Sequence, residues 1–71
     1  MPSRRALHST ISMRLFAARE ATGLTQAEVA EMVGRTQSYV SRCETGKRRI
    51  DLSELMEFAR IYKRPISYFL E

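Results

Sequence analysis

The sequence predicts a compact all-α domain of five helices, and three observations point the same way. Apolar residues recur at spacings of three and four along most of the chain, which is the period of an amphipathic helix. Capping residues stand before these segments, and glycine or proline stands after most of them. A chain of 71 residues allows one domain with a small core, which buries only about 60% of the surface that the unfolded chain exposes.

Residues 1–9 show no apolar periodicity and are predicted to form a flexible basic tail, with the folded domain over residues 10–71. Arg4 and Arg5 allow two interpretations, an arm that reaches along a DNA groove or a frayed terminus, and the second is the simpler. We expect His8 to be solvated. The first helix is predicted from Ser9 or Thr10 to just before Gly23.

The inward face of this first helix is formed by residues spaced at four and three, with Phe16 at its edge. They are Ile11, Leu15 and Ala18.

Two short helices then follow, joined by a tight turn. Thr25 and Glu28 have the spacing of a capping box, so the second helix begins there, and Gly34 ends it. Its inward stripe is predicted at Ala27, Ala30 and Val33, with Val29 beside them. Thr36 caps a third helix over residues 37–44, which ends before Gly46. Two helices separated by so few residues form a helix-turn-helix.

The third helix carries a polar outer surface. Val40 is its inward anchor with Cys43 three residues later, which leaves Gln37, Ser38, Ser41 and Arg42 on the other faces. Glutamine pairs with adenine edges and arginine with guanine edges, and a helix of this size fits the DNA major groove. The alternative is an ordinary solvated face, and the helix alone does not decide between them.

The net charge of +4 is concentrated near this helix. Residues 35–49 hold five basic side chains against Glu44, while the rest of the chain balances at seven against seven. Three of the five form the loop Lys47-Arg48-Arg49, which is either a solvated loop or a phosphate clamp. Its place beside the third helix favours the clamp.

A fourth helix over residues 51–62 is capped by Asp51 or Ser53 and cannot continue through Pro65. Its core stripe is predicted at Leu52, Leu55, Met56, Ala59 and Tyr62, widened by Phe58. A short last helix or turn holds Ile66, Tyr68, Phe69 and Leu70, which is unusually apolar for an exposed end. We expect Ile66 and Phe69 to face inward and Tyr68 outward, and this end to serve also as a dimer interface.

Residues 11–70 resemble the phage repressor and Cro-like helix-turn-helix family, also called the XRE family, without gaps. The motifs that carry the resemblance are Gly23-Leu24-Thr25-Gln26 before Ala30, Thr36-Gln37-Ser38 with Val40-Ser41-Arg42, Glu44-x-Gly46-Lys47-Arg48, and Leu52-x-x-Leu55-x-x-x-Ala59. The resemblance implies a five-helix, lambda-repressor-like fold and sequence-specific binding of double-stranded DNA by a transcriptional regulator, most simply a repressor.

The resemblance also implies roles for individual residues. It pairs Arg19 with Glu44, which ties the first helix to the reading helix. The expected base readers are Gln37, Ser38 and Arg42, with contributions from Tyr39 and Ser41. The expected phosphate contacts are Gln26, Thr36, Lys47 and Arg48. The chain departs from the family pattern at Arg35, Cys43 and Lys63, where an apolar residue, tyrosine or leucine, and glycine are usual.

Other function classes are disfavoured. There is no paired carboxylate in a pocket-forming context, no glycine-rich phosphate loop and no Cys/His pair, so we expect no enzyme and no cofactor. One cysteine and one distant histidine cannot build a zinc site, so no metal is expected. No apolar run is long enough for a membrane span, and no signal peptide is visible, so we expect a cytoplasmic protein encoded by a bacterium or phage.

The expected partners are a pseudo-palindromic duplex and a second copy of the chain. Two alternatives stay open. One is an antitoxin-like interaction module that binds a protein partner with the same fold, which a second apolar patch would favour. The other is a helical scaffold that has lost DNA binding. The polar and basic face of the third helix disfavours this second alternative.

Overall fold

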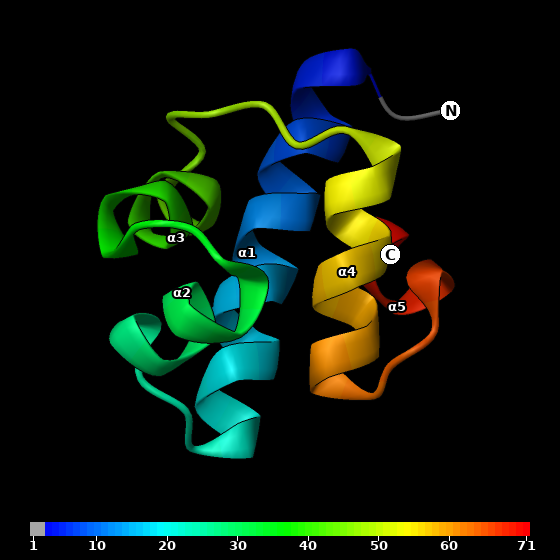
Figure 1. The fold of residues 1–71 in the computed structure, drawn as a ribbon. Coiled ribbons are helices and arrows are strands. Elements are labelled where there is room, and N and C mark those ends of the chain that lie inside the picture. The colour runs from blue at the N-terminus through cyan, green and yellow to red at the C-terminus, as the bar shows by residue number, and fades with distance from the viewer. Residues whose placement is uncertain (1–2) are drawn as a thin grey trace.

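The computed structural model describes residues 3–71, and these fold into five helices with no strand among them. The helices are α1 (Arg4–Thr22), α2 (Gln26–Val33), α3 (Gln37–Thr45), α4 (Leu52–Tyr62) and α5 (Ile66–Leu70). α1 runs through the middle, with α2 and α3 on one side and α4 and α5 on the other (Figure 1). The predicted all-α fold of five helices is confirmed.

α2, α3 and α4 each begin at a capping residue that the sequence predicted. The Thr25 hydroxyl accepts the N–H of Glu28 at 3.0 Å, and the Glu28 carboxylate accepts the N–H of Thr25 at 2.8 Å. Asp51 and Glu54 form the same reciprocal pair before α4. Thr36 caps α3 with its side chain. These local hydrogen bonds satisfy N–H groups that have no partner inside the helix.

Gly34 and Gly46 end α2 and α3 in the left-handed conformation, with φ of 69° and 81°. A side chain at either position would be strained, so the turn of the helix-turn-helix and the exit from α3 both depend on glycine. Lys63 ends α4 in the same conformation with φ of 56°, although it is not a glycine.

Lys63→Gly should therefore stabilise the fold. Relief of the left-handed strain, less the extra freedom that glycine gives the unfolded chain, is worth about 1 kcal/mol. For a domain of this size the melting temperature should rise by about 4–8 °C. Arg60→Gly, one turn earlier in the same helix, is the matched control and should lower the melting temperature by a similar amount, because it weakens a helix interior. Equal or lower melting of Lys63→Gly would contradict the strain.

The expected start of the first helix is wrong. α1 begins at Arg4, because the Ser3 side chain accepts the N–H of Ala6 at 3.1 Å and caps the helix there. His8 is not simply solvated, since its Nε2–H donates to the carbonyl oxygen of Gly46 at 2.8 Å. The first turns of α1 are thus held against the end of α3. Met1 and Pro2, the rest of the predicted tail, lie outside the described residues.

The core is formed by one buried face of each helix. Its fully buried large side chains are Phe58, Phe69, Leu15, Val29, Val40 and Cys43. Three residues predicted for the core stripes are exposed instead: Ala27, Leu52 (66%) and Met56 (55%). Spacing marks the apolar side of a helix but does not show how far the neighbouring helices extend over it.

Candidate nucleic-acid interface

The outer face of α3 presents polar side chains to solvent. Gln37, Ser38 and Arg42 are exposed and Ser41 is half-buried, whereas Val40 and Cys43 on the opposite face are completely buried. The N-cap Thr36 is exposed at the start of the same helix. Four of the five predicted base readers and one predicted phosphate contact therefore share one accessible surface.

Tyr39 does not belong to that surface. It is 8% exposed and stacks on Phe58 of α4, with ring centroids 6.1 Å apart and planes inclined by 10°. The guanidinium groups of Arg35 and Arg48 lie 4.7 and 4.8 Å from its ring centroid. Burial raises the pKa of the Tyr39 hydroxyl. Its assignment as a base reader is corrected, because the ring faces the core between two cations.

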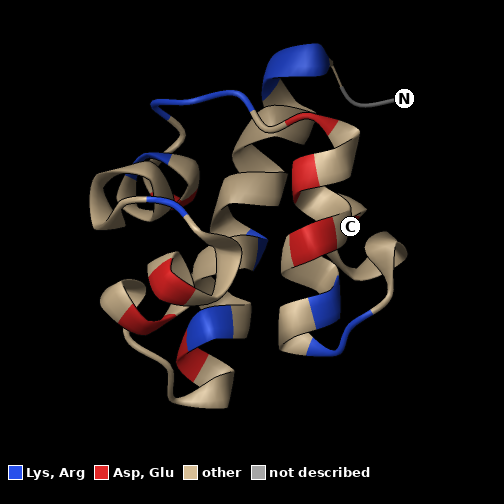
Figure 2. Ribbon diagram, viewed as in Figure 1, with Lys and Arg blue, Asp and Glu red and all other residues tan. Residues whose placement is uncertain are grey.

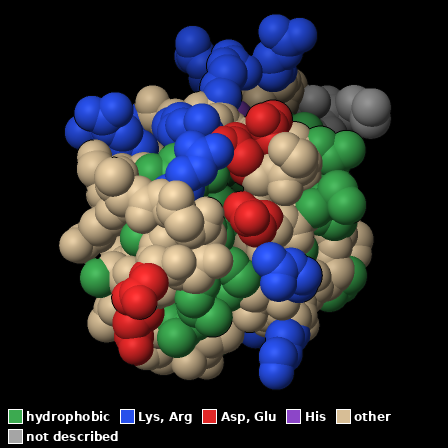
Figure 3. All heavy atoms as spheres, in the orientation of Figure 1, with side chains coloured by type: hydrophobic (Ala, Val, Ile, Leu, Met, Phe, Trp, Pro, Cys, Tyr) green, Lys and Arg blue, Asp and Glu red, His purple; other side chains and the backbone are tan. Residues whose placement is uncertain are grey.

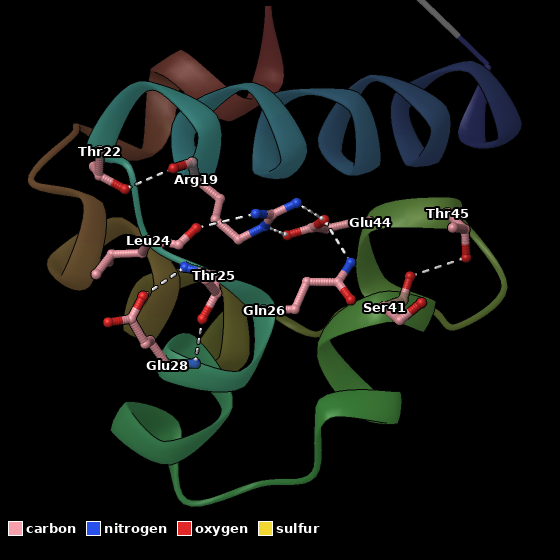
Figure 4. Close-up of polar contacts among 9 residues, drawn as sticks. All are labelled: Arg19, Thr22, Leu24, Thr25, Gln26, Glu28, Ser41, Glu44 and Thr45. Atoms are coloured by element: carbon pink, nitrogen blue, oxygen red, sulfur yellow. Dashed lines mark hydrogen bonds and ion pairs between the residues drawn. The ribbon is translucent and has the colours of Figure 1, made fainter.

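α3 is tied to the rest of the molecule by Arg19 and Glu44, as predicted (Figure 4). Arg19 Nε and Nη2 donate to the two carboxylate oxygens of Glu44 at 2.7 and 3.1 Å. The remaining guanidinium nitrogen, Nη1, donates to the carbonyl oxygen of Leu24 at 3.0 Å. The two side chains are only 11% and 4% exposed, so this is a bidentate pair largely removed from water. The hydrogen bond to Glu44 raises the pKa of Arg19 and keeps it charged.

Gln26 joins this pair rather than pointing its side chain at solvent. Its amide Nε2 donates to Glu44 Oε1 at 3.1 Å (Figure 4). Gln26 is also the first residue of α2, where a backbone N–H has no partner within the helix. The Gln26 side chain therefore fixes α3 to the start of α2, and the phosphate contact expected at Gln26 stays a prediction.

The loop between α3 and α4 contains two of the expected phosphate contacts, Arg48 and Lys47, and their surroundings differ. Arg48 Nη1 donates to Glu54 Oε1 and to the carbonyl oxygen of Arg49, both at 2.9 Å. Lys47 is exposed and takes part in none of the ion pairs within residues 3–71. The Arg48 side chain, 36% exposed, is therefore engaged in an ion pair, whereas Lys47 has no such contact within residues 3–71.

Glu54 joins these cations, since Arg35 Nη2 also lies 3.7 Å from its other oxygen. The hydrogen bond from Arg48 lowers the pKa of the Glu54 carboxyl group, against the opposing effect of burial. A depressed pKa in the folded state stabilises the fold above the ordinary pKa of about 4.3, and this stabilisation is lost as pH falls through the folded pKa.

Glu54→Gln should flatten this acid dependence. Glutamine retains an oxygen for the N–H of Asp51 but cannot be titrated, so the melting temperature of the variant should fall less between pH 6 and 3, by a few degrees. At pH 6 the variant should melt below the wild type, because the ion pair with Arg48 is gone. Thermal unfolding followed by circular dichroism at several pH values tests both points, and parallel curves for the two proteins would contradict them.

Basic side chains gather where α1 begins and the α3–α4 loop crosses, as Figures 2 and 3 show. Within residues 3–71 there is no group of three or more histidine, cysteine or acidic residues placed to hold a metal ion. None of the helices in that range has the length and apolar character needed to cross a membrane. The structure thus presents hydrogen-bonding groups on an exposed helix and, after its end, two basic residues, Lys47 and Arg49, that form no ion pair within residues 3–71.

Comparisons with known proteins agree with this geometry. The model of a family described as a helix-turn-helix domain matches residues 11–66. No curated protein matches the chain significantly. The restriction-modification controller protein C.AhdI from Aeromonas hydrophila is 28% identical with a TM-score of 0.78, over 86% of this chain and 92% of that one.

Two further solved structures are similar. The BldD DNA-binding domain of S. venezulae is 25% identical with a TM-score of 0.80, over 92% of this chain and 97% of that one. HppE in its apo form is 21% identical with a TM-score of 0.84, which shows a shared fold alone. The match covers 92% of this chain but only 36% of the HppE chain.

Proposed function

Because the chain belongs to the helix-turn-helix domain family, we propose that it is a transcriptional regulator that binds double-stranded DNA by placing α3 in the major groove. The observation that carries the proposal is the exposed polar face of α3, together with Arg42, Lys47 and Arg49, which form no ion pair within residues 3–71. The neighbours C.AhdI and BldD, named as a controller protein and a DNA-binding domain, support it. We assign no catalytic activity to the chain.

Base recognition falls to Gln37, Ser38 and Arg42, with Ser41 at the margin. Glutamine pairs with two adenine atoms and arginine with two guanine atoms, so these side chains discriminate between base pairs. Lys47, the Thr36 side chain and the backbone N–H of Gln26 bind phosphates on either side. These contacts fix the register of α3 without reading sequence.

We expect binding to repress transcription, since a domain seated in the major groove of a promoter blocks access to it. The protein then acts in the cytoplasm of a bacterial or phage-infected cell.

A homodimer is part of the proposal. α5 leaves Leu70 44% exposed and Ile66 and Tyr68 half-buried at the end of the chain. Phe69, predicted for the same interface, is completely buried in the core and cannot be part of it. Two-fold pairing through α5 sets two reading helices about 34 Å apart on a pseudo-palindrome.

Selection of binding sites from random duplexes tests the function. A recovered two-fold consensus supports both DNA reading and the dimer, and recovery of no preferred sequence would overturn base recognition. Light scattering of the free protein and of the complex tests the dimer alone. A monomer in both states would rule the dimer out and leave the reading of DNA unaffected.

One observation favours a second candidate function, a module that binds a protein partner. Leu52 and Met56 lie four residues apart on the exposed side of α4, although both are large and apolar. Leu52→Glu combined with Met56→Glu should leave duplex binding unchanged and abolish any stable protein complex that the wild type forms. A loss of duplex binding in this variant would connect α4 to DNA instead.

A further inference from the structure

An open hollow of about 170 Å³ lies between the beginning of α1 and the loop after α3. Its lining residues are Arg4, Leu7, His8, Ile11, Arg49 and Ile50. Leu7, Ile11 and Ile50 are half-buried, whereas Arg4 and Arg49 are exposed. The hollow is therefore lined by three half-buried apolar side chains and by two exposed arginines, one from α1 and one from the loop after α3.

A hydrogen bond joins the two elements that carry these arginines. The hydrogen bond from His8 Nε2 to the Gly46 carbonyl oxygen joins α1 to the residue that ends α3. Gly46 also packs against α1, since a Cβ built on it would be in ordinary van der Waals contact with Ser12 Oγ at 3.6 Å and His8 Nε2 at 3.8 Å. Arg4 is the first residue of a capped helix, so its backbone is set by the fold.

The charges around the hollow are not balanced. None of its lining residues is acidic, and neither Arg4 nor Arg49 enters an ion pair within residues 3–71. Two cations that line one hollow repel each other, and an anion placed between them removes that cost. Of the three basic loop residues, Arg48 is already held by Glu54, which leaves Lys47 and Arg49 on the outside.

We propose that Arg4 and Arg49 form a joint contact for a backbone phosphate of DNA, outside the base pairs that α3 reads. Arg49 follows Gly46, which ends α3, and Arg4 lines the same hollow, so a duplex that extends past this end of α3 would bring its backbone to both arginines. The exposed guanidinium groups meet a phosphate that approaches from outside, whereas a free anion would have to sit over the apolar side chains. This inference rests on the proposed function and extends it to the first turn of α1.

Arg4→Glu and Arg49→Ala test the contact, with Arg60→Ala as control at the far end of α4. Arg4 is the first helical residue, where an acidic side chain is favoured by the helix dipole, so Arg4→Glu should fold normally. Melting followed by circular dichroism checks this. Affinities are measured over a salt series on two duplexes, one ending with the segment read by α3 and one extended by several base pairs on both sides.

On the long duplex, Arg4→Glu and Arg49→Ala should each bind several-fold more weakly and lower the salt slope by up to about 0.9, the value for the one phosphate that the two arginines share. On the short duplex they should match the wild type, and Arg60→Ala should match it on both. Wild-type slopes for Arg4→Glu and Arg49→Ala on the long duplex would overturn the contact, while sequence preference would still support the proposed function. If the wild type bound neither duplex, the proposed function itself would fail.

A titration with inorganic phosphate separates the two sources of the anion. NMR shifts at Arg4 and Arg49 in millimolar phosphate, together with no difference between long and short duplexes, would identify a site for a free anion and overturn the DNA contact. Shifts that need the long duplex support it.

Discussion

Removal of either partner of the Arg19–Glu44 pair should destabilise the domain more than any change on the reading face. Glu44 is 4% exposed and Arg19 is 11% exposed, so an alanine at one position leaves the other charge buried without its partner. Such a change costs about 3 kcal/mol or more. At about 4–8 °C per kcal/mol for a domain of this size, a loss of about 3 kcal/mol should lower the melting temperature by roughly 12–24 °C.

The matched control is Glu31→Ala, which removes an exposed acid of α2 that enters no ion pair within residues 3–71 and should leave melting nearly unchanged. A double variant, Arg19→Met with Glu44→Leu, should recover part of the loss, because no charge is then left buried. Where a single variant still folds, its ranking of duplex sequences should be that of the wild type. Melting equal to the wild type in both single variants would refute the bracing role.

Arg42→Ala should weaken binding to the preferred duplex by about 1–3 kcal/mol and relax the choice of base at one position. Arg42 is exposed on α3, and its guanidinium enters no ion pair within residues 3–71, so it is free to pair with a base edge. Gln37→Ala should behave alike. Lys47→Ala should weaken preferred and scrambled duplexes equally and lower the salt slope by about one unit, because a phosphate contact carries no sequence information.

Titration of each variant against both duplexes at several salt concentrations distinguishes the two behaviours. Arg60→Ala, on α4, serves as the charge-matched control and should change neither affinity nor slope. If Arg42→Ala weakened both duplexes by the same factor, Arg42 would be a phosphate contact rather than a base reader.

Local chemistry allowed most of the fold to be predicted. Thr25 and Asp51 cap their helices through residues three positions away, and Gly34 and Gly46 end helices through their own conformation. None of these features depends on distant parts of the chain. The Arg19–Glu44 contact is different, since the partners lie 25 positions apart in the sequence and only the family resemblance implied it.

The errors arose where tertiary contacts decide. Tyr39 stands among the polar residues of α3 in the sequence, but its ring is buried against Phe58 and two arginines. Arg48 forms an ion pair with Glu54 that nothing in the neighbouring sequence indicates, and its expected phosphate contact stays a prediction. The early start of α1 did leave a signal, since Leu7 continues the spacing of four through Ile11 to Leu15, and Ser3 precedes it as a cap.

Cys43 lies on the inner side of the reading helix, completely buried, and it is the only cysteine of the chain. Burial raises the pKa of its thiol, so the reactive thiolate is scarce at neutral pH as long as α3 stays in place. A thiol reagent can reach the sulfur only when α3 separates from the core. The labelling rate of Cys43 therefore reports how often α3 separates from the core. DNA bound to α3 should slow this labelling in proportion to the occupancy of the DNA.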